Sequence, residues 1–335
     1  MLIESFRRFF DSDIWFSFKQ SKVTICAAAV SAAIILAAIA APLISLHNPF
    51  DPAVISLMDA FSPPVWLEEG SWVFPLGSDD QGRDLYSAIL YGSRVSLLIG
   101  FSSVVLAMFV GVALGLVAGY VGGVVDGVIM RVADVQISFP AILIALLIDG
   151  VMRALLPGGR HEELVFYVLV LSIGLSQWVQ FARTVRGSTM VERNKEYVQA
   201  ARVIGISAPI IMLRHILPNV MGPVLVIGTI SLAVAILTEA TLSFLGVGVP
   251  PTEPSLGTLI RIGQDFLFSG EWWIVIFPGV TLATLILAVN LLGDWMRDAF
   301  NPKLRYDQSW CRQHTHPFWK LVILRLSFQL AAERW

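Results

Sequence analysis

The sequence predicts an all-α polytopic membrane protein with six transmembrane helices and an additional helix on the cytoplasmic side. Of its 335 residues, 56% are hydrophobic and only 14% are charged, whereas a soluble domain carries about 25% charged residues. Long runs without charge recur along the chain, and such runs need lipid to solvate their apolar surface. Lys and Arg collect in alternate connecting segments, which is typical of segments that face the cytoplasm.

The uncharged runs place the spans and divide the chain. We expect a cytoplasmic segment over residues 1–22, a transmembrane domain over 23–305 and a divergent tail over 306–335. The spans lie at about residues 23–46, 95–121, 128–150, 164–184, 220–245 and 272–293. The third run is short for a bilayer of about 30 Å, because a helical residue rises only about 1.5 Å. It must extend back through Asp134 and Arg131, which lie three residues apart and can pair.

The first uncharged run shares some features with a secretion signal. Basic residues precede the run Val23–Leu46, as they do in signal peptides. The apolar core of a signal peptide has about 7–15 residues, however, and this run is longer. We therefore interpret it as an uncleaved first transmembrane helix.

The distribution of charge predicts the orientation. All but five of the 23 Lys and Arg residues precede the first span, follow the sixth, or lie between the second and third or the fourth and fifth. The exceptions are Arg83, Arg94, Arg153, Arg160 and Arg261. The positive-inside rule then places both termini in the cytoplasm. The first outer loop agrees, because it is rich in acidic residues: Asp51, Asp59, Glu68, Glu69, Asp79, Asp80 and Asp84.

Several functions are disfavoured. A formal net charge of −2 gives no electrostatic basis for binding nucleic acid. No GxxxxGK(S/T) phosphate loop occurs, so the chain has no such site for ATP. Because no HExxH pair or GxSxG elbow occurs either, we expect no catalytic residues. Cys311, His314 and His316 lack a fourth ligand, so we expect no metal site.

The acidic segment Asp79–Asp84 has the composition of a calcium loop but not its spacing. Its glycine comes too early, and no glutamate stands at the twelfth position. We expect instead that Ser78 caps a helix and that the acids occupy its first turn. Arg83 would then pair with Asp80 and Asp84.

Two features lie inside predicted spans. Gly111, Gly115 and Gly119 have the spacing that lets helix backbones approach closely in membranes. Glu239 interrupts the fifth span toward its outer end. An ionisable residue in an apolar helix is a candidate for function, and a hydrogen bond to a neighbouring helix is the alternative.

The segment between the fourth and fifth spans, Arg183–Asn219, has the pattern of helices rather than of a linker. Tyr197, Ala200, Ala201 and Ile204 recur at helical spacing and predict an amphipathic helix. The two alanines leave this helix thin on one side, so that it can enter a groove on a soluble partner. An interfacial helix that only packs on lipid headgroups is the alternative.

A turn and a second helix follow. Gly205 can end the first helix in the left-handed conformation. Ser207 and Pro209 then predict the start of a second short helix. Pro218 predicts a break in the chain just before the fifth span.

The pattern Gln199-Ala200-Ala201-x3-Gly205, followed by Leu217-Pro218, resembles the "EAA" loop of ABC importer permeases. In that family the loop is a coupling helix that docks on the ATPase subunit. The resemblance implies coupling roles for Glu196, Gln199, Ala200, Ala201, Gly205, Leu217 and Pro218, within a coupling loop over residues 190–218. Gln199 stands where the family usually has glutamate, and His215 where it commonly has isoleucine.

Further motifs resemble the dipeptide/oligopeptide/nickel importer permeases. They are Leu76–Asp84 continuing through Ile89–Arg94, Asp134 with Ser138–Pro140, and Glu239–Ala240 with Leu242–Gly246. The resemblance covers about Ser17 to Arg305 and is to the second permease of the pair that such importers use. It implies a type I-like ABC importer transmembrane domain in the cell inner membrane.

The resemblance also implies function and partners. The chain would form the translocation path for peptides together with a second permease subunit, two ATP-binding subunits and an outer solute-binding protein. It would bind no cofactor itself, because ATP belongs to the partner subunits. Asp134 and Glu239 are candidates for the translocation path or gate, and Asp80 and Arg83 for contact with the binding protein. Nickel cargo, or a secondary transporter or channel, are the alternatives.

The tail after Arg305 has no counterpart in that family. Phe318–Trp335 is apolar with interspersed basic residues, so we expect an interfacial helix. A seventh span, which would move the C-terminus outside, is the alternative.

Overall fold

A computed structural model describes residues 18–19, 21–46, 48–49, 55–155 and 160–299. Within these ranges the secondary structure is helical, and the one strand-like pairing is an isolated bridge between Ser78 and Asp84. The chain divides into two units, residues 21–293 and residues 1–20 with 294–335. In the described part of the latter, the rings of Phe18 and Trp295 meet edge to face with their centroids 5.2 Å apart. The tail 306–335 lies outside the described residues.

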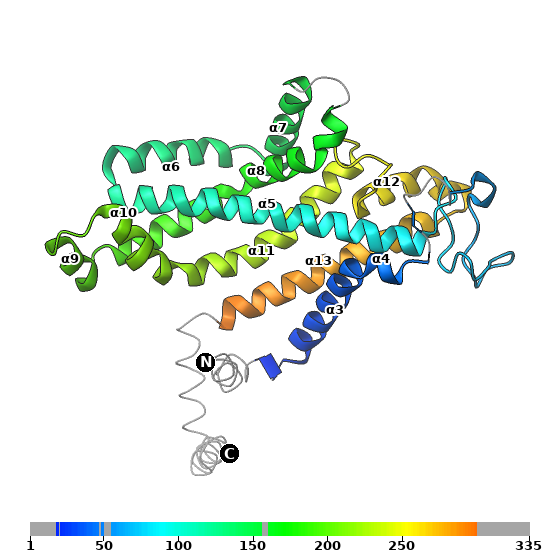
Figure 1. Ribbon diagram of the computed structural model, residues 1–335, viewed down its shortest axis with the longest axis horizontal. Helices are drawn as coiled ribbons and strands as arrows, with labels where there is room; N and C mark the ends of the chain where they lie inside the picture. The colour runs from blue at the N-terminus through cyan, green and yellow to red at the C-terminus, as the bar shows by residue number, and fades with distance from the viewer. Residues whose placement is uncertain (1–17, 20, 47, 50–54, 156–159, 300–335) are drawn as a thin grey trace, which may run out of the picture. The chain divides into compact units, whose positions relative to one another are not determined.

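Five helical segments are long and apolar enough to cross a membrane, which confirms the predicted fold class. They are α3 (Lys22–Ile39), α5 (Leu85–Val121), the part Leu164–Glu192 of α8 (Arg160–Glu192), the continuous segment Ala208–Phe244, and α13 (Trp273–Ala299). A bent pair, α6 (Gly123–Ile137) and α7 (Ala141–Leu155), makes a sixth if it is counted as one span. Figure 1 shows α5, α8 and α11 (Leu217–Phe244) running alongside one another.

The region predicted as the third span, residues 128–150, is bent. α6 and α7 meet at 97°, and the break falls at Pro140, which lacks an N–H and disfavours helix at the residue before it. Gln136 holds the end of α6 against α8. Its Nε2 donates to the Leu175 carbonyl at 2.8 Å, and its Oε1 accepts from Trp178 Nε1 at 2.7 Å.

Glycines let α5 and α8 pack with their backbones almost in contact. A Cβ added at Gly111 would lie 2.5 Å from the Trp178 carbonyl oxygen, and one added at Gly115 would lie 2.5 Å from that of Ala182. At Gly119 the nearest backbone atom would be the Arg186 carbonyl oxygen, at 2.8 Å. The predicted close packing at these positions is therefore confirmed, and α8 is its partner.

α5 begins at Leu85, well before the predicted span at residue 95, and its start differs from our expectation. Asp84, not Ser78, is the N-cap, and its Oδ2 accepts from the Ser87 N–H at 2.9 Å. Ser78 lies in the outer loop, where its Oγ donates to the Asp59 carbonyl and accepts from the Ser62 N–H. Before α5 come the short helices α4 (Ala41–Ile44) and η1 (Leu57–Asp59).

The α11–α12 connection, residues 245–255, leads into an outer helix that the sequence analysis did not assign. This is α12 (Leu256–Phe266), which is followed by the short turn η3 (Leu267–Ser269). Ser255 caps α12 by accepting from the Thr258 N–H at 3.3 Å. Leu256 and Leu259 are fully buried against α5 and α11.

Replacing Gly115 with alanine should destabilise the protein by about 1–3 kcal/mol, because the new Cβ would force α8 away from α5. Thermal unfolding in detergent would measure the effect. Gly187→Ala on α8 is the matched control, because its added Cβ meets no atom within 4 Å and alanine favours helix. Equal losses of stability in both variants would contradict the packing argument.

Candidate functional site

The predicted coupling loop, residues 190–218, is called the coupling segment below. It forms the helix–turn–helix that the sequence predicted. α9 (Glu196–Val203) is followed by Gly205 at φ +86°, a left-handed conformation that glycine adopts without strain. The short α10 (Ala208–Ile210) then begins after Ser207. Ser207 occupies the N-cap position, but its side chain makes no capping hydrogen bond. Figure 1 shows α9 at the same end of the helices as the C-terminus of α5.

Part of the predicted apolar face of α9 is buried against the rest of the protein, and part of it is exposed. Ala201 is buried together with Val198. Ala200, in contrast, is exposed, and so are Val203 at 88% and Ile204 at 78%. α9 therefore rests on the protein through a narrow stripe and presents an apolar patch, Ala200, Val203 and Ile204, away from it.

The departure from glutamate at position 199 has a local effect. Gln199 Nε2 donates to the Asn194 carbonyl at 3.0 Å. A carboxylate has no N–H and could only accept, so glutamate could not make this bond. The amide therefore ties the start of α9 to the turn that follows α8.

The Tyr197 hydroxyl links α9 to the end of α8 and to the start of α11. Its hydroxyl donates to the Glu192 carboxylate at the end of α8 and accepts from Asn219 Nδ2 of α11 at 3.1 Å. Asn219 also donates to the His215 carbonyl at 2.7 Å. Burial and the nearby Glu192 carboxylate raise the pKa of the Tyr197 phenol, so the hydroxyl remains a donor around neutral pH.

Pro218 does not break the chain, contrary to the prediction. A π-helical stretch, η2 (Ile211–Ile216), comes directly before it, and helix continues over Ala208–Phe244. A π-turn changes the hydrogen-bond register, which accommodates a proline that lacks an N–H. The part of the coupling segment from Ala208 onward and the fifth span are consequently one continuous helix, and the turn at Gly205 separates α9 from it.

Two arginines attach the coupling segment to the end of α5. Arg193 Nη1 donates to the carbonyls of Gly119 and Tyr120, at 2.9 and 3.3 Å. Those are among the last carbonyls of α5, where a cation also complements the helix dipole. The guanidinium of Arg202 in α9 lies over the Tyr120 ring, 4.9 Å from its centroid.

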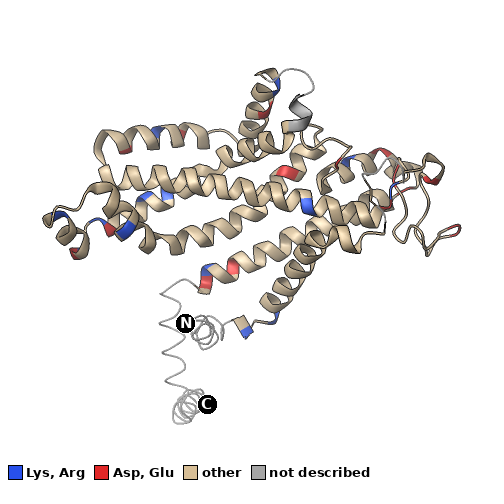
Figure 2. Ribbon diagram, in the orientation of Figure 1, with Lys and Arg blue, Asp and Glu red and all other residues tan. Residues whose placement is uncertain are grey.

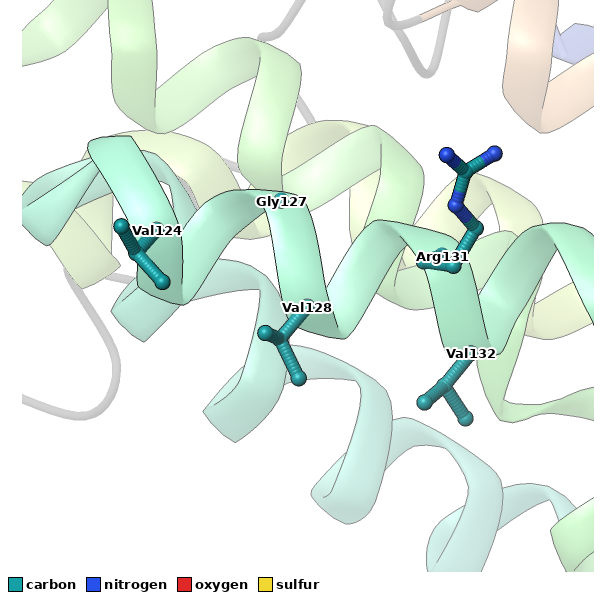
Figure 3. A pocket seen from close by; sticks show the side chains of 5 residues that line it. All are labelled: Val124, Gly127, Val128, Arg131 and Val132. Carbon is teal, nitrogen blue, oxygen red and sulfur yellow. The ribbon is translucent and has the colours of Figure 1, made fainter.

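The ion pairs of α6 differ from the predicted pairing of Asp134 with Arg131. Asp134 pairs with Arg183 of α8 at 2.6 Å rather than with Arg131. Asp126 of α6 pairs with Arg186 of α8. Both pairs therefore fasten α6 to α8. Figure 3 shows Val124, Val128 and Val132 in a row along a shallow pocket on α6, with Arg131 extending from another side of the helix.

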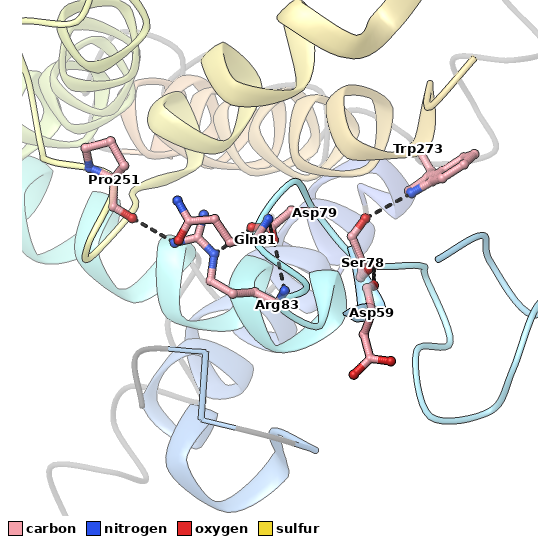
Figure 4. Close-up of polar contacts among 7 residues, drawn as sticks. All are labelled: Asp59, Ser78, Asp79, Gln81, Arg83, Pro251 and Trp273. Carbon is pink, nitrogen blue, oxygen red and sulfur yellow. Dashed lines mark hydrogen bonds and ion pairs between the residues drawn. The ribbon is translucent and has the colours of Figure 1, made fainter. Parts of the chain in front are cut away.

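In the outer loop, Arg83 is an internal residue. It is 2% exposed, and its Nε donates to Asp79 Oδ2 at 2.6 Å while its Nη1 donates to the Pro251 carbonyl at 2.7 Å (Figure 4). The expected pairing with Asp80 and Asp84 is therefore wrong. This burial argues against Arg83 as a direct contact for another protein.

Asp80 is more accessible than Arg83 and remains a predicted contact for the binding protein. Its side chain is partly exposed. Partial burial, together with the neighbouring Asp79 carboxylate, raises the pKa of its carboxyl. The same loop is held to α13, because Trp273 Nε1 donates to the Ser78 carbonyl at 3.2 Å (Figure 4).

Glu239 is fully buried within a polar cluster at the outer end of α11. Its Oε1 accepts from Ser243 Oγ at 2.8 Å, and Ser243 Oγ accepts from the Val249 N–H at 3.3 Å. Thr258 of α12 donates to the Val249 carbonyl at 3.0 Å. Glu239 thus anchors the α11–α12 connection, and its role and that of Asp134 in a translocation path stay predictions.

A contact from α7 was missed by sequence reasoning. Arg153 Nη2 donates to the Val247 carbonyl at 2.6 Å, and its Nε pairs with Asp149 at 2.8 Å. The spacing of four residues between Asp149 and Arg153 was the available signal. The carbonyl partner, nearly a hundred residues away, left no signal in the sequence.

Figure 2 shows charged residues around α9 and around the outer loops, and further ones along α6 and α7. Among the described residues, no group of three or more His, Cys, Asp and Glu could hold a metal ion. Cys311, His314 and His316 lie outside those residues. The arrangement offers an exposed apolar patch at one end and a hydrogen-bonded polar network at the other.

Comparison with known proteins identifies related sequences. Residues 111–306 match the family model "binding-protein-dependent transport system inner membrane component". Residues 8–64 match "N-terminal TM domain of oligopeptide transport permease C".

Curated relatives match most of the chain. The di/tripeptide transport system permease protein DppC of Pseudomonas aeruginosa is 36% identical over 88% of this chain and 92% of its own length. The dipeptide transport system permease protein DppC of Escherichia coli K12 is 38% identical over 88% and 93%. Among solved structures, a chain of the inward-facing MetNI methionine ABC transporter matches with a TM-score of 0.47 and 16% identity, over 62% of this chain and 93% of that one.

Replacing Arg83 with methionine should destabilise the protein by about 3–5 kcal/mol, because it leaves Asp79 buried without its partner. Thermal unfolding in detergent would again be measured. Arg94→Met, at an exposed position of α5, is the matched control and should change stability by less than about 1 kcal/mol. Similar, small effects in both would refute the internal role of Arg83.

Proposed function

The chain belongs to the family of binding-protein-dependent transport system inner membrane components, and from that premise we propose that it is a peptide permease subunit of an ATP-binding cassette importer. The curated relatives named above are permeases for dipeptides and tripeptides, which favours short peptides over nickel as cargo. The chain itself has no ATP-binding motif. Hydrolysis is therefore the work of separate subunits, and this subunit is not an enzyme.

The proposed assembly contains this chain, a second permease, two ATP-binding subunits and an outer solute-binding protein, in the lipid bilayer of the inner membrane. Both termini face the cytoplasm, as the positive-inside rule requires. α9 then lies on the cytoplasmic side, within reach of the ATP-binding subunits. The acidic outer loop faces the binding protein, with Asp80 as its candidate contact.

The exposed apolar patch of α9 is the observation that carries this proposal. Ala200, Val203 and Ile204 point away from the protein, and apolar surface on a firmly held helix fits a groove on a partner. Its mounting also supports a mechanical role. Helix is continuous from α10 through η2 into α11, and Arg193 and Arg202 connect the coupling segment to α5.

We infer the following transport cycle. Closure of the ATP-binding subunits moves α9, and the attached helices α5 and α11 rock with it. ATP thereby shifts the population between inward-open and outward-open states, because the docked subunits contact α9 differently in their open and closed forms. Five further residues determine the shape of the moving segment: Glu196, Gln199, Gly205, Leu217 and Pro218.

Reconstitution tests the proposed function. The chain, a second permease, the ATP-binding subunits and the binding protein would be placed in proteoliposomes, and uptake of a radiolabelled dipeptide would be measured with and without ATP. We expect uptake that requires ATP and every subunit. Uptake by this chain alone without nucleotide would instead indicate a secondary transporter.

Placing a charge on the apolar patch should prevent docking. Val203→Asp should reduce co-purification of the ATP-binding subunits at least tenfold and abolish uptake, since a carboxylate would be buried without a partner in their groove. Val203→Ile is the matched control and should keep both. Undiminished co-purification of Val203→Asp would remove the docking role.

Weakening the link between α9 and α5 should uncouple hydrolysis from transport. Tyr120→Leu removes the aromatic face beneath Arg202, a contact of about 0.5–1 kcal/mol, so uptake per ATP hydrolysed should fall by about two- to fivefold. ATP hydrolysis itself should persist, because docking is intact. Tyr120→Phe keeps the ring and should behave as wild type. An unchanged ratio in Tyr120→Leu would show that this contact transmits nothing.

A further inference from the structure

A cavity of about 490 Å³ opens near the outer end of the bundle, between α5, α8 and the α11–α12 connection. Val95 and Ile99 of α5 and Phe166 of α8 form apolar walls, and Pro250, Thr252 and Glu253 come from the connection. Volumes of about 300–1,000 Å³ with mainly apolar walls and a few polar groups are typical of small-molecule sites. The cavity is thus of a size that holds a short peptide.

The connection that carries Glu253 is held in place on several sides. Arg153 of α7 binds its Val247 carbonyl, Thr258 of α12 binds its Val249 carbonyl, and Arg83 binds its Pro251 carbonyl. Glu253 itself closes a turn, with its N–H donating to the Pro250 carbonyl at 3.2 Å. These contacts fix the backbone of Glu253 before any ligand arrives, which lowers the entropic cost of binding.

Glu253 is the one ionisable residue among those that line the cavity. Its side chain is exposed, so its carboxylate is accessible to a ligand that enters the cavity. Charge complementarity therefore selects a ligand with a cationic group next to an apolar one. A peptide with a free N-terminus has that combination, because its α-ammonium is adjacent to its first side chain.

We propose that Glu253 binds the α-ammonium of the incoming peptide and that the walls formed by Val95, Ile99 and Phe166 receive its first side chain. This inference rests on the proposed function, since it names the substrate group that the permease holds. Glu253 would be a specificity residue of the transport path. It is separate from Glu239, which is buried in the anchor of the same connection.

Equilibrium binding of two probes tests the assignment. The purified importer in nanodiscs, without the binding protein, would be titrated with leucyl-leucine and with N-acetyl-leucyl-leucine, whose N-terminus is uncharged. We expect wild type to bind the free dipeptide about tenfold more tightly, the difference that a charge-assisted hydrogen bond supplies. Glu253→Gln should abolish this preference, and Glu253→Asp should retain part of it.

Glu68→Gln, an exposed carboxylate of the outer loop, is the matched control and should keep the preference. With saturating binding protein, Glu253→Gln should also lower the maximal rate of ATP-driven leucyl-leucine uptake several-fold. No preference in wild type, or an undiminished one in Glu253→Gln, would overturn the inference. If wild type from the same purification imports the dipeptide in proteoliposomes, the proposed function survives that result; if it imports none, the proposed function itself fails.

Discussion

The close approach of α5 and α8 is the constraint on which the rest of the structure depends. Gly119 brings the α8 backbone at Arg186 against the last turn of α5. α8 consequently ends where Arg193 can reach the final carbonyls of α5. α9 starts a few residues later and inherits its position from this contact. A larger residue at Gly119 would displace the coupling segment, which begins directly beyond this contact.

The two ends of the helix bundle are built differently. At the inner end, helix is continuous from α10 through η2 into α11, and α9 leaves apolar side chains uncovered. At the outer end, several buried polar side chains form hydrogen bonds with one another or with backbone groups, because an unpaired carboxyl or guanidinium is costly away from water. Glu239, Arg83 and Arg153 each secure the α11–α12 connection. The proposed transport cycle uses both features, because the inner end would move with the ATP-binding subunits while the outer end stays fixed.

Much of this architecture could be predicted from local sequence patterns. Gly205 predicted the left-handed turn because few other residues adopt positive φ, and the glycines of α5 predicted close packing because of their spacing. Predictions failed where a distant partner decides. Asp134 pairs with Arg183 rather than its neighbour Arg131, and Arg83 donates to the distant Pro251 carbonyl. The break predicted at Pro218 is absent for a local reason, because the π-helical stretch before it accommodates the proline. The bend falls at Pro140, a local signal that the prediction did not use, whereas α12 packs against α5, which is distant in the sequence.

Cross-linking at Ala200 tests the central claim most directly. After the native cysteines Cys26 and Cys311 are replaced, a single cysteine at position 200 would be treated with a bifunctional reagent in the assembled importer. The account predicts a cross-link to an ATP-binding subunit whose yield changes when ATP binds, together with loss of peptide uptake. A cysteine that reacts only with reagents confined to the outer side, or that links to no ATP-binding subunit while uptake proceeds, would contradict it.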